Sequence, residues 1–456
     1  MYVICNSIRV GKRVHSIVYR SFNRYLSAAK YDDANQMDKF KLAERYTSGK
    51  YNVWVEFIEL SMKYKTLNLG HGYPDYNPST YISQYLTEVA IESGQFNQYT
   101  RGFGHMRLVS ALAKFYSILN GRHIDPNSEV MITVGAYEAL FCAIQSTLEP
   151  GDEAIIIEPF FDSYEPLVRT VGGVPRFIAL KNTNPDSTVS RASDWKLDPD
   201  ELASLFNTKT KLIILNTPQN PTGKVFDLEE LTMIGDLCKK HNVLCISDEV
   251  YEWLVYAPTK HIRIASLPGM WERTITIGSA AKSLSMTGWK LGWAYGPDYL
   301  MKNLQVLHQI TIYTCATPVQ EAVARVFEHE LKVFGTNDSV IRGITKDLRP
   351  KLDFTIDVLV KNNFKPIIPD GGYFIVADWT NYENKVDISS ETDEHRDFKF
   401  VKWLAKNYKL QAIPFSVFFS SKHKAEASDY MRFCFFKKDE TLHQFEDILK
   451  RFKESN

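Results

Sequence analysis

Short apolar segments alternate with amphipathic ones between residues 128 and 300, and this alternation restricts the fold more than any other sequence feature. The stretch Leu228–His241 is typical of the amphipathic segments, because Leu231, Ile234 and Cys238 recur at helical spacing. Strands that alternate with helices predict a mostly parallel sheet covered by helices on both faces. The segments expected to form its strands are Val130–Val134, Ala154–Ile157, Leu212–Leu215, Val243–Ile246 and Thr274–Ile277.

Polar residues follow four of these apolar segments, at the point where a parallel sheet binds its ligands. Asn216 and Asp248 follow two of them, Lys282 follows a third, and Gly135-Ala136-Tyr137 follows Val130–Val134. A single Asp after a strand is more often a helix cap than a catalyst. Four such ends in one sheet favour a functional site.

The balance of charge argues against nucleic acid or an anionic membrane as a partner, since there are 54 basic and 54 acidic residues. No apolar run approaches the roughly 18 residues that a membrane span needs. The six cysteines are scattered without a CxxC pair, so neither a metal site nor a disulfide framework is expected. These features are typical of a soluble enzyme from a reducing compartment.

The N-terminal segment differs from the rest, because residues 1–31 contain six basic side chains and no acidic one. Apolar residues such as Ile8, Val14 and Phe22 are interleaved at roughly helical spacing. This pattern is typical of a mitochondrial transit peptide, which we expect over residues 1–36. The predicted location is the mitochondrial matrix; a basic tail without a targeting role, on a cytoplasmic protein, is the alternative.

Three blocks of sequence are jointly specific, because they occur in a fixed order at plausible spacing. They are Asn216-Thr-Pro-Gln-Asn-Pro-Thr-Gly223, Ser247-Asp-Glu-Val-Tyr251, and Gly278-Ser-Ala-Ala-Lys282 with Gly288-Trp-Lys-Leu-Gly292. Together they resemble fold-type-I aminotransferases that depend on pyridoxal 5′-phosphate (PLP). Within these, they resemble the kynurenine aminotransferase / glutamine transaminase K (cysteine-S-conjugate β-lyase) family, from about Asn52 to the C-terminus.

The resemblance implies an α/β fold of the aspartate aminotransferase type. Its large PLP-binding domain would hold a mostly parallel seven-stranded sheet between helices, over residues 76–326. A smaller α+β domain would follow over residues 327–456, where β-rich pieces lie among charged amphipathic segments. Residues 37–75 would form an N-terminal segment that joins the small domain.

The resemblance also assigns the catalytic residues. A transaminase holds PLP as an imine and needs a lysine amine that can lose its proton, which matches Lys282. In the family this lysine also moves the proton between the substrate carbon and the cofactor. Asp248 matches the carboxylate that keeps the pyridine nitrogen protonated. Asn220 and Tyr251 match the donors to the cofactor's phenolate oxygen, although Asn220 also belongs to a turn.

The cofactor phosphate is expected to lie at the start of a helix, where the backbone N–H groups of Ala136 and Tyr137 can bind an anion. Ser279 would add a hydroxyl group. Lys290 occupies a position where many relatives carry Arg, and it supplies positive charge. Phe160 matches the aromatic residue that stacks on the pyridine ring, although a Phe-Phe pair is by itself more often part of the core.

The α-carboxylate of an amino-acid substrate calls for a planar guanidinium group, and Arg432 is the family match. Asn216 and Gly70 match a second contact to the same carboxylate. Trp54 and Tyr137 resemble the walls of an aromatic substrate pocket.

In the family the pocket is completed by a neighbouring subunit, and Tyr99 and Tyr313 match the residues that enter from it. The resemblance therefore implies a homodimer with sites at a twofold interface. The alternative, that these aromatic residues serve only the core or the interface, stays open.

The resemblance implies transamination of kynurenine and related aromatic, glutamine-like or sulfur amino acids, with a 2-oxo acid as amino acceptor. Kynurenine would give kynurenic acid after cyclisation. A cysteine-S-conjugate β-lyase and a non-catalytic PLP-fold binding protein are the alternatives. Three residues depart from the family pattern without removing a catalytic group: His71 replaces Gln, Ala281 replaces Gly, and Ile310 replaces Asn.

Overall fold

The computed structural model describes residues 42–46, 53–185 and 189–456. The chain divides into two compact units, Met1–Thr47 and Ser48–Asn456. Only the short helix η2 (Glu44–Tyr46) is described in the first unit, so the transit peptide expected over residues 1–36 lies outside the described residues. Among the described helices, none is long and apolar enough to cross a membrane.

The larger sheet of the second unit has seven strands, and all neighbouring pairs are parallel except those made by β11. This confirms the mostly parallel seven-stranded sheet that the sequence predicts. The strands, in spatial order, are β2 (Val130–Thr133), β11 (Gly292–Tyr295), β10 (Thr274–Ser279), β9 (Leu244–Asp248), β8 (Thr210–Asn216), β3 (Glu153–Glu158) and β4 (Val174–Ala179).

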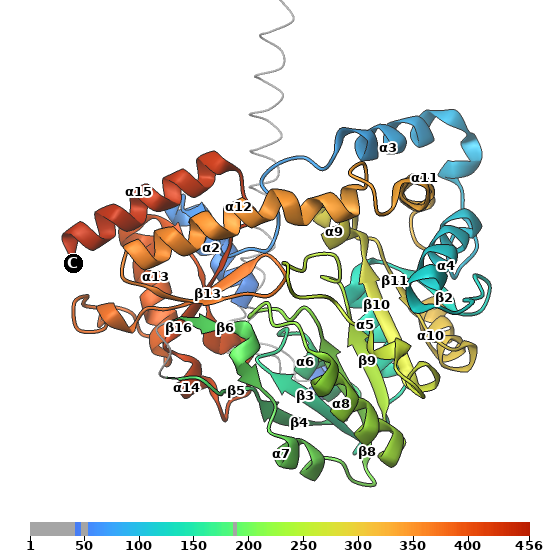
Figure 1. Cartoon of the computed structure of the whole chain (residues 1–456), viewed down its shortest axis with the longest axis horizontal. Helices are drawn as coiled ribbons and strands as arrows, with labels where there is room; N and C mark the ends of the chain where they lie inside the picture. The colour runs from blue at the N-terminus through green and yellow to red at the C-terminus, as the bar shows by residue number, and fades with distance from the viewer. Residues whose placement is uncertain (1–41, 47–52, 186–188) are drawn as a thin grey trace, which may run out of the picture. The chain divides into compact units, whose positions relative to one another are not determined.

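Both faces of this sheet are buried, because successive side chains of a strand point to opposite faces and helices cover each face. In β3, Ile155 packs in one apolar cluster with helix α8 (Leu228–His241), whereas Ile156 packs in another with α5 (Gly135–Gln145). Figure 1 shows these two helices on opposite sides of the strands. Helix α8 begins at a capping box between Asp227 and Glu230, as the sequence-based helix expectation requires.

A second sheet of five strands forms the smaller α+β part. Its strands are mostly antiparallel and pack with helices from the C-terminal part of the chain. The strands, in spatial order, are β15 (Ile413–Pro414), β16 (Tyr430–Cys434), β13 (Phe374–Asp378), β12 (Lys365–Ile368) and β6 (Ser190–Arg191). The helices that pack with them include α12 (Val340–Lys361), α13 (Arg396–Tyr408) and α15 (Asp439–Ser455).

Two short strands from early in the chain pair with strands of the C-terminal part. Strand β6 pairs with β12, and β1 (Leu67–Asn68) pairs with β14 (Leu410–Gln411). The latter pairing places an N-terminal segment against the C-terminal part, while the boundary expected at residue 326 stays a prediction. The remaining elements are α2 (Val53–Tyr64), α3 (Thr80–Glu92), α4 (Met106–Asn120), α6 (Tyr164–Thr170), α7 (Pro199–Ser204), α9 (Ala280–Ser283), α10 (Asp298–Thr311), α11 (Thr317–Val333), α14 (Lys424–Ala427), β5 (Lys181–Asn182) and β7 (Trp195–Lys196), with short 3-10 helices between them.

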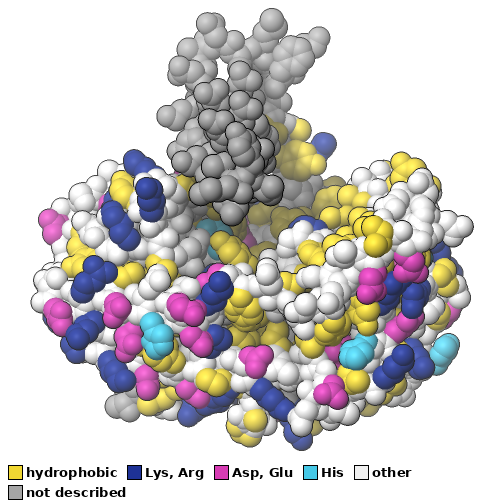
Figure 2. Space-filling model, turned by 90° about the horizontal axis from the view of Figure 1, so that it is seen from above, with side chains coloured by type: hydrophobic (Ala, Val, Ile, Leu, Met, Phe, Trp, Pro, Cys, Tyr) yellow, Lys and Arg dark blue, Asp and Glu magenta, His cyan; other side chains and the backbone are white. Residues whose placement is uncertain are grey.

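Basic and acidic side chains are interspersed over the face shown in Figure 2, and no broad area of one sign stands out there. This distribution agrees with the equal numbers of basic and acidic residues in the sequence.

Candidate active site

The carboxyl ends of β8, β9 and β10 lie side by side, because Asn216 pairs with Asp248 and Asp248 pairs with Ile277 across the parallel strands. Beyond these ends lies a cavity of about 240 Å³. Most of the residues that the sequence predicts for the site line this cavity. They are Trp54, Ala136, Tyr137, Asn216, Asn220, Asp248, Tyr251, Ser279, Lys282, Lys290 and Arg432.

Lys282 belongs to the short helix α9, which follows β10 directly. Its Nζ donates a 2.8 Å hydrogen bond to the hydroxyl oxygen of Tyr373, a residue that the sequence analysis did not place in the site. Burial lowers the pKa of Lys282 from its ordinary value to about 8. A lysine amine with this pKa can both accept and return a proton near neutral pH.

Asp248 ends β9 at the base of the cavity and is held by two donors. The hydroxyl of Tyr164 donates to Oδ2 at 2.6 Å, and the backbone N–H of Val250 donates to Oδ1 at 3.3 Å. Burial raises the pKa of Asp248 to about 6, while the bond from Tyr164 lowers it. A cationic ring nitrogen beside this carboxylate would favour its charged form further.

A buried ionic network lies immediately after Asp248 in sequence. Glu249 binds the imidazole of His261 at 2.7 Å, and Glu252 binds the guanidinium group of Arg263. Glu249, Glu252 and His261 bring metal-ligand atoms together, but Arg263 also lies 3.8 Å from Glu249. Because the guanidinium group of Arg263 already lies within ion-pair distance of both carboxylates, we interpret the network as a support for the segment that carries Asp248 and Tyr251.

An anion-binding cradle is formed where α5 begins. Gly135 has a φ of 71°, and a Cβ built on it would lie 3.4 Å from Nζ of Lys290. Gly292 of β11 packs closely against this helix start, because a Cβ built on it would lie 2.5 Å from the backbone nitrogen of Ala136. With the hydroxyl of Ser279 on the same cavity, the helix N-terminus and the lysine charge suit a phosphate group.

Arg432 crosses the cavity floor from β16 and is 1% exposed. Its guanidinium group donates to Oδ1 of Asn220 at 2.7 Å and to the carbonyl oxygen of Gly70 at 2.9 Å. Among the described residues, its Nε has no hydrogen-bond partner. Burial lowers the pKa of Arg432 to about 10, so the group stays charged at neutral pH. A buried cation with an unused donor suits an anionic ligand.

Aromatic side chains form the rest of the wall. The indole nitrogen of Trp54 donates to Asp162 at 2.6 Å, which fixes the ring, and burial raises the pKa of Asp162. Phe161 and Phe374 also line the cavity, although neither was predicted. The guanidinium carbon of Arg432 lies 3.8 Å from the ring centroid of Phe374.

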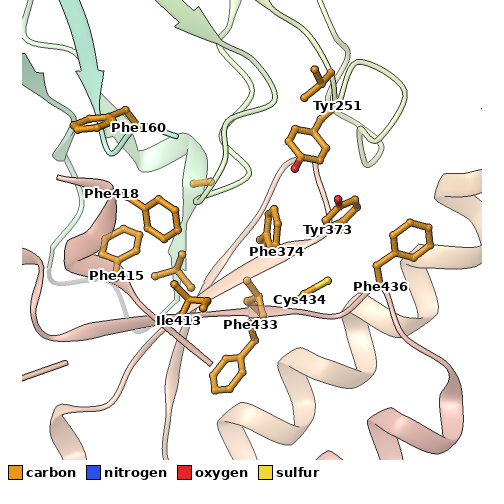
Figure 3. Close-up of a cluster of buried hydrophobic side chains, with 14 of the residues drawn as sticks. Phe160, Tyr251, Tyr373, Phe374, Ile413, Phe415, Phe418, Phe433, Cys434 and Phe436 are labelled. Atoms are coloured by element: carbon orange, nitrogen blue, oxygen red, sulfur yellow. The ribbon is translucent and has the colours of Figure 1, made fainter. Parts of the chain in front are cut away.

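Two residues that the sequence assigns to the site, Phe160 and Gly70, are not among those that line the cavity. Phe160 does not line the cavity: its ring stacks on Phe177 with centroids 5.6 Å apart, and it lies beside Phe418 in the core (Figure 3). Phe161, the next residue, is the one at the cavity wall. Gly70 accepts a hydrogen bond from Arg432 through its carbonyl oxygen, whereas Gly72 lines the cavity. The expected contact of Gly70 with a substrate carboxylate stays a prediction.

Asn216 lines the cavity, but both ends of its side-chain amide already bind the chain. Nδ2 donates to the carbonyl oxygen of Asp248 at 2.9 Å, and Oδ1 accepts from the backbone N–H of Asn220 at 2.7 Å. Asn216 therefore holds the turn that presents Asn220. Its expected contact with a substrate carboxylate stays a prediction.

Tyr99 and Tyr313 lie away from this cavity and contact each other, with ring centroids 5.6 Å apart. They are 82% and 53% exposed, which is unusual for large aromatic side chains. They therefore do not line this cavity within the chain, and their expected entry into the pocket of a neighbouring subunit stays a prediction.

The three departures from the family pattern lie in different environments. Ala281 lines the cavity next to Lys282, whereas Ile310 is 76% exposed on α10. The ring of His71 lies 5.8 Å from that of Trp54, and its Nε2 has no hydrogen-bond partner among the described residues. Burial, with the nearby cation of Arg432, lowers the pKa of His71 to about 4, so this imidazole is neutral at pH 7.

Comparison with known proteins identifies the family. The family model for aminotransferase class I and II matches residues 64–448. The chain belongs to this family. Human kynurenine--oxoglutarate transaminase 3 is 51% identical over 414 residues, which cover 90% of each chain. The mouse kynurenine--oxoglutarate transaminase 1 is 45% identical and covers 91% of this chain and 99% of its own length.

A solved structure confirms the architecture. The crystal structure of Bna3p, described as a candidate kynurenine aminotransferase from Saccharomyces cerevisiae, superposes with a TM-score of 0.84 at 29% identity. It covers 91% of this chain and all of its own. The aminotransferase therefore has the α/β fold of the aspartate aminotransferase type that its motifs predict.

Aminotransferases of this family depend on PLP, which withdraws electrons from the substrate α-carbon when it is bound. The residues of this cavity fit such a cofactor. The helix start at Gly135 and the amine of Lys290 form a cradle for a phosphate group, Asp248 offers a carboxylate, and Lys282 offers an amine. These groups converge on one cavity, as a single phosphorylated ring requires.

Proposed function

We propose that this aminotransferase transfers the amino group of kynurenine to a 2-oxo acid, and that it also accepts related aromatic, glutamine-like or sulfur amino acids. Kynurenine would become the corresponding 2-oxo acid, which cyclises to kynurenic acid. One observation carries the proposal: Arg432, buried and with its Nε unpartnered among the described residues, shares one cavity with Lys282 and an aromatic wall. The names of the relatives at 51% and 45% identity support kynurenine as a donor.

Different residues of the cavity would have different roles in this reaction. Arg432 would bind the substrate carboxylate, and Trp54, Tyr137 and Phe161 would pack on its side chain. Lys282 Nζ would remove the proton from the α-carbon and later return one. Asp248 would keep the ring nitrogen of the cofactor charged.

The proposal is tested with the purified full-length protein. Kynurenine is added with and without 2-oxoglutarate, and kynurenic acid is measured by chromatography; phenylalanine, glutamine and methionine are compared as donors. We expect kynurenic acid beyond one equivalent per bound cofactor only when the 2-oxo acid is present, because the cofactor itself can accept one amino group. Release of pyruvate from a cysteine S-conjugate, without any transamination, would instead show a β-lyase. Absence of both products from PLP-loaded protein would contradict the proposal.

We further propose that the enzyme is a homodimer in which Tyr99 and Tyr313 enter the partner's substrate pocket. The high exposure of these two rings supports the proposal, and so does the neighbouring surface, where Ile310 is 76% and Ile312 38% exposed. Large apolar side chains that cluster at the surface mark an interaction site more often than a solvated face.

We also propose that residues 1–36 direct the protein to the mitochondrial matrix. The six basic residues without an acid before residue 32 support this location. A fusion of residues 1–36 to a fluorescent reporter should co-localise with a matrix marker, and mature protein should lack the leader by N-terminal sequencing. A matched fusion in which the six basic residues become Gln should stay in the cytosol. Diffuse cytosolic fluorescence of the unchanged fusion would contradict the proposal.

A further inference from the structure

Lys282, Tyr373 and Gly72 form a short hydrogen-bonded chain at the wall of the cavity. Nζ of Lys282 donates to the hydroxyl oxygen of Tyr373 at 2.8 Å, and that hydroxyl donates to the carbonyl oxygen of Gly72 at 2.8 Å. We propose that Tyr373 is a positioning residue, which holds the Lys282 amine in place whenever that amine is not joined to the cofactor. The proposal rests on the aminotransferase function above and adds a residue to its machinery.

The backbone of Tyr373 is fixed by a tight approach of two loops. Gly371 leaves no room for a side chain, because its Cβ would lie 2.6 Å from the carbonyl oxygen of Leu254. The backbone N–H of Gly372 donates to that same oxygen, and the hydroxyl of Tyr256 donates to the carbonyl oxygen of Gly372 at 2.8 Å. The segment that precedes Tyr373, just before β13, therefore cannot shift independently of Leu254.

The ring of Tyr373 is equally constrained, since the residue is 0% exposed. It makes an edge contact with Tyr251 at a centroid distance of 5.2 Å and packs against Phe436 at 5.1 Å (Figure 3). A phenylalanine at this position should keep the ring packing and lose the contacts of the hydroxyl, which are those with Lys282, with Gly72 and with the side chain of Tyr251.

The chemistry of the contact follows from the direction of its hydrogen bonds. When Lys282 Nζ takes a proton from the substrate carbon, it becomes an ammonium group, and it becomes an amine again when the proton is returned. Tyr373 gains and loses no proton in these steps, because burial raises its pKa well above the ordinary value. Its oxygen binds the ammonium form more strongly than the amine. Tyr373 thus favours the protonated lysine and keeps Nζ at a fixed point of the wall.

Other charged or titratable groups act on Lys282 from a greater distance, and they affect the pH at which its amine loses a proton. Asp248 and Cys434 raise its pKa, whereas Arg432 and Lys290 lower it. Tyr251 faces the lysine as well, with its ring centroid 5.6 Å from Nζ. Among the described residues, Tyr373 makes the only hydrogen bond to this amine.

The test compares Tyr373→Phe with a matched control, Tyr256→Phe. The control removes a buried hydroxyl from the same loop approach but does not touch Lys282. Each full-length variant is loaded with pyridoxamine 5′-phosphate, which leaves the lysine amine free. Limiting acetic anhydride is applied between pH 6 and 10, and acetylation of Lys282 is measured by peptide mass spectrometry against the exposed Lys302. Cofactor content and melting temperature report folding.

In the wild type we expect the reactivity of Lys282 to have its midpoint near pH 8. In Tyr373→Phe the midpoint should fall by about one pH unit, because the ammonium form loses its acceptor. In a separate sample loaded with PLP, the single-turnover rate with an amino donor should fall about tenfold at its optimum. Tyr256→Phe should titrate like the wild type.

An unchanged midpoint in Tyr373→Phe would overturn the proposal. Equal shifts in both variants would overturn it too, because they would reflect loosening of the loop. The labelling requires no amino donor, so a failure of the kynurenine assignment would leave this result unaffected.

Discussion

Tyr164 donates a hydrogen bond of 2.6 Å to Oδ2 of Asp248, and both side chains are buried. Tyr164 lies at the start of α6, whereas Asp248 ends β9, so the bond joins a helix on one face of the large sheet to a strand end. A neutral donor stabilises the charged carboxylate without neutralising it. Asp248 thus remains an anion that a cationic ring nitrogen can bind.

Tyr164→Phe should therefore raise the pKa of Asp248 above its value of about 6, because the bond from Tyr164 lowers that pKa. The acid limb of the pH–rate profile should move to higher pH, with activity at pH 6 falling roughly tenfold relative to pH 8. Steady-state rates between pH 5.5 and 9 measure this. Tyr382→Phe, which removes a buried hydroxyl bound to the carbonyl of Asn362, is the control. Superimposable acid limbs for Tyr164→Phe and wild type would refute the assigned role.

Arg432→Lys should weaken binding of both the amino acid and the 2-oxo acid, because a lysine cannot form the bidentate contact with a carboxylate. A loss of about 2–3 kcal/mol is expected in kcat/KM for each substrate. Cofactor content, measured by absorbance after alkaline release, should be unchanged. Arg396→Lys, at a partly exposed ion pair with Glu383, should have no such effect. If KM for neither substrate changes, Arg432 does not bind the carboxylate.

Phe160→Ala and Phe161→Ala should separate stability from function. Phe160 is 3% exposed and stacked on Phe177, so its truncation should cost about 3–5 kcal/mol in the free energy of unfolding. Phe161 lines the cavity, so its truncation should raise KM for aromatic donors and cost less stability. Thermal unfolding and substrate kinetics of both variants test this. If instead Phe160→Ala raised KM and Phe161→Ala cost more stability, Phe160 would be the residue that contacts the substrate.

Mixing two inactive variants tests the shared site. Lys282→Ala and Tyr99→Ala, exchanged after gentle dissociation, form heterodimers in which one site has both defects and the other has neither. Up to half of the sites in heterodimers should regain activity, since a twofold interface makes each contact twice. A mixture of Lys282→Ala with Lys282→Asn serves as the control and should stay inactive. No recovery after exchange shown by mass would mean that Tyr99 serves its own chain.

Sequence periodicity predicts the large sheet well, because its strands are buried on both faces and stand out as apolar runs before polar residues. Asn216, Asp248 and Lys282 could be located in this way, since each follows a run whose end is clear. Arg432 could be located because a charged residue amid apolar neighbours is rare on a surface. Strand geometry fixes the position of the side chain for Asn216, Asp248 and Arg432, and Lys282 lies in the short helix that follows a strand directly.

The residues that the sequence does not place reliably lie where the chain is irregular. Phe160 and Phe161 follow a proline after β3, and with no regular period there, two identical neighbours cannot be assigned to core or cavity from the sequence. Gly70 and Gly72 pose the same problem. Tyr373 was missed because Gly371-Gly372-Tyr373 resembles an ordinary strand start. Its contact with Lys282 joins segments 91 residues apart, and that distance leaves no local pattern.

Strand β6 has consequences for anyone who would recombine this enzyme with a relative. Its two residues, Ser190 and Arg191, lie between strands of the large sheet in sequence. They nevertheless pair with Ile367 and Ile368 of β12, in the second sheet. A chimaera that exchanges only residues 327–456 would therefore pair β12 of the relative with β6 of this chain. The side chains across this strand pair would then come from two different proteins and would not be matched. Crossovers that transfer residues 189–196 together with the C-terminal part should preserve this edge. For recombination, the unit of exchange is discontinuous in sequence, although it is continuous in space.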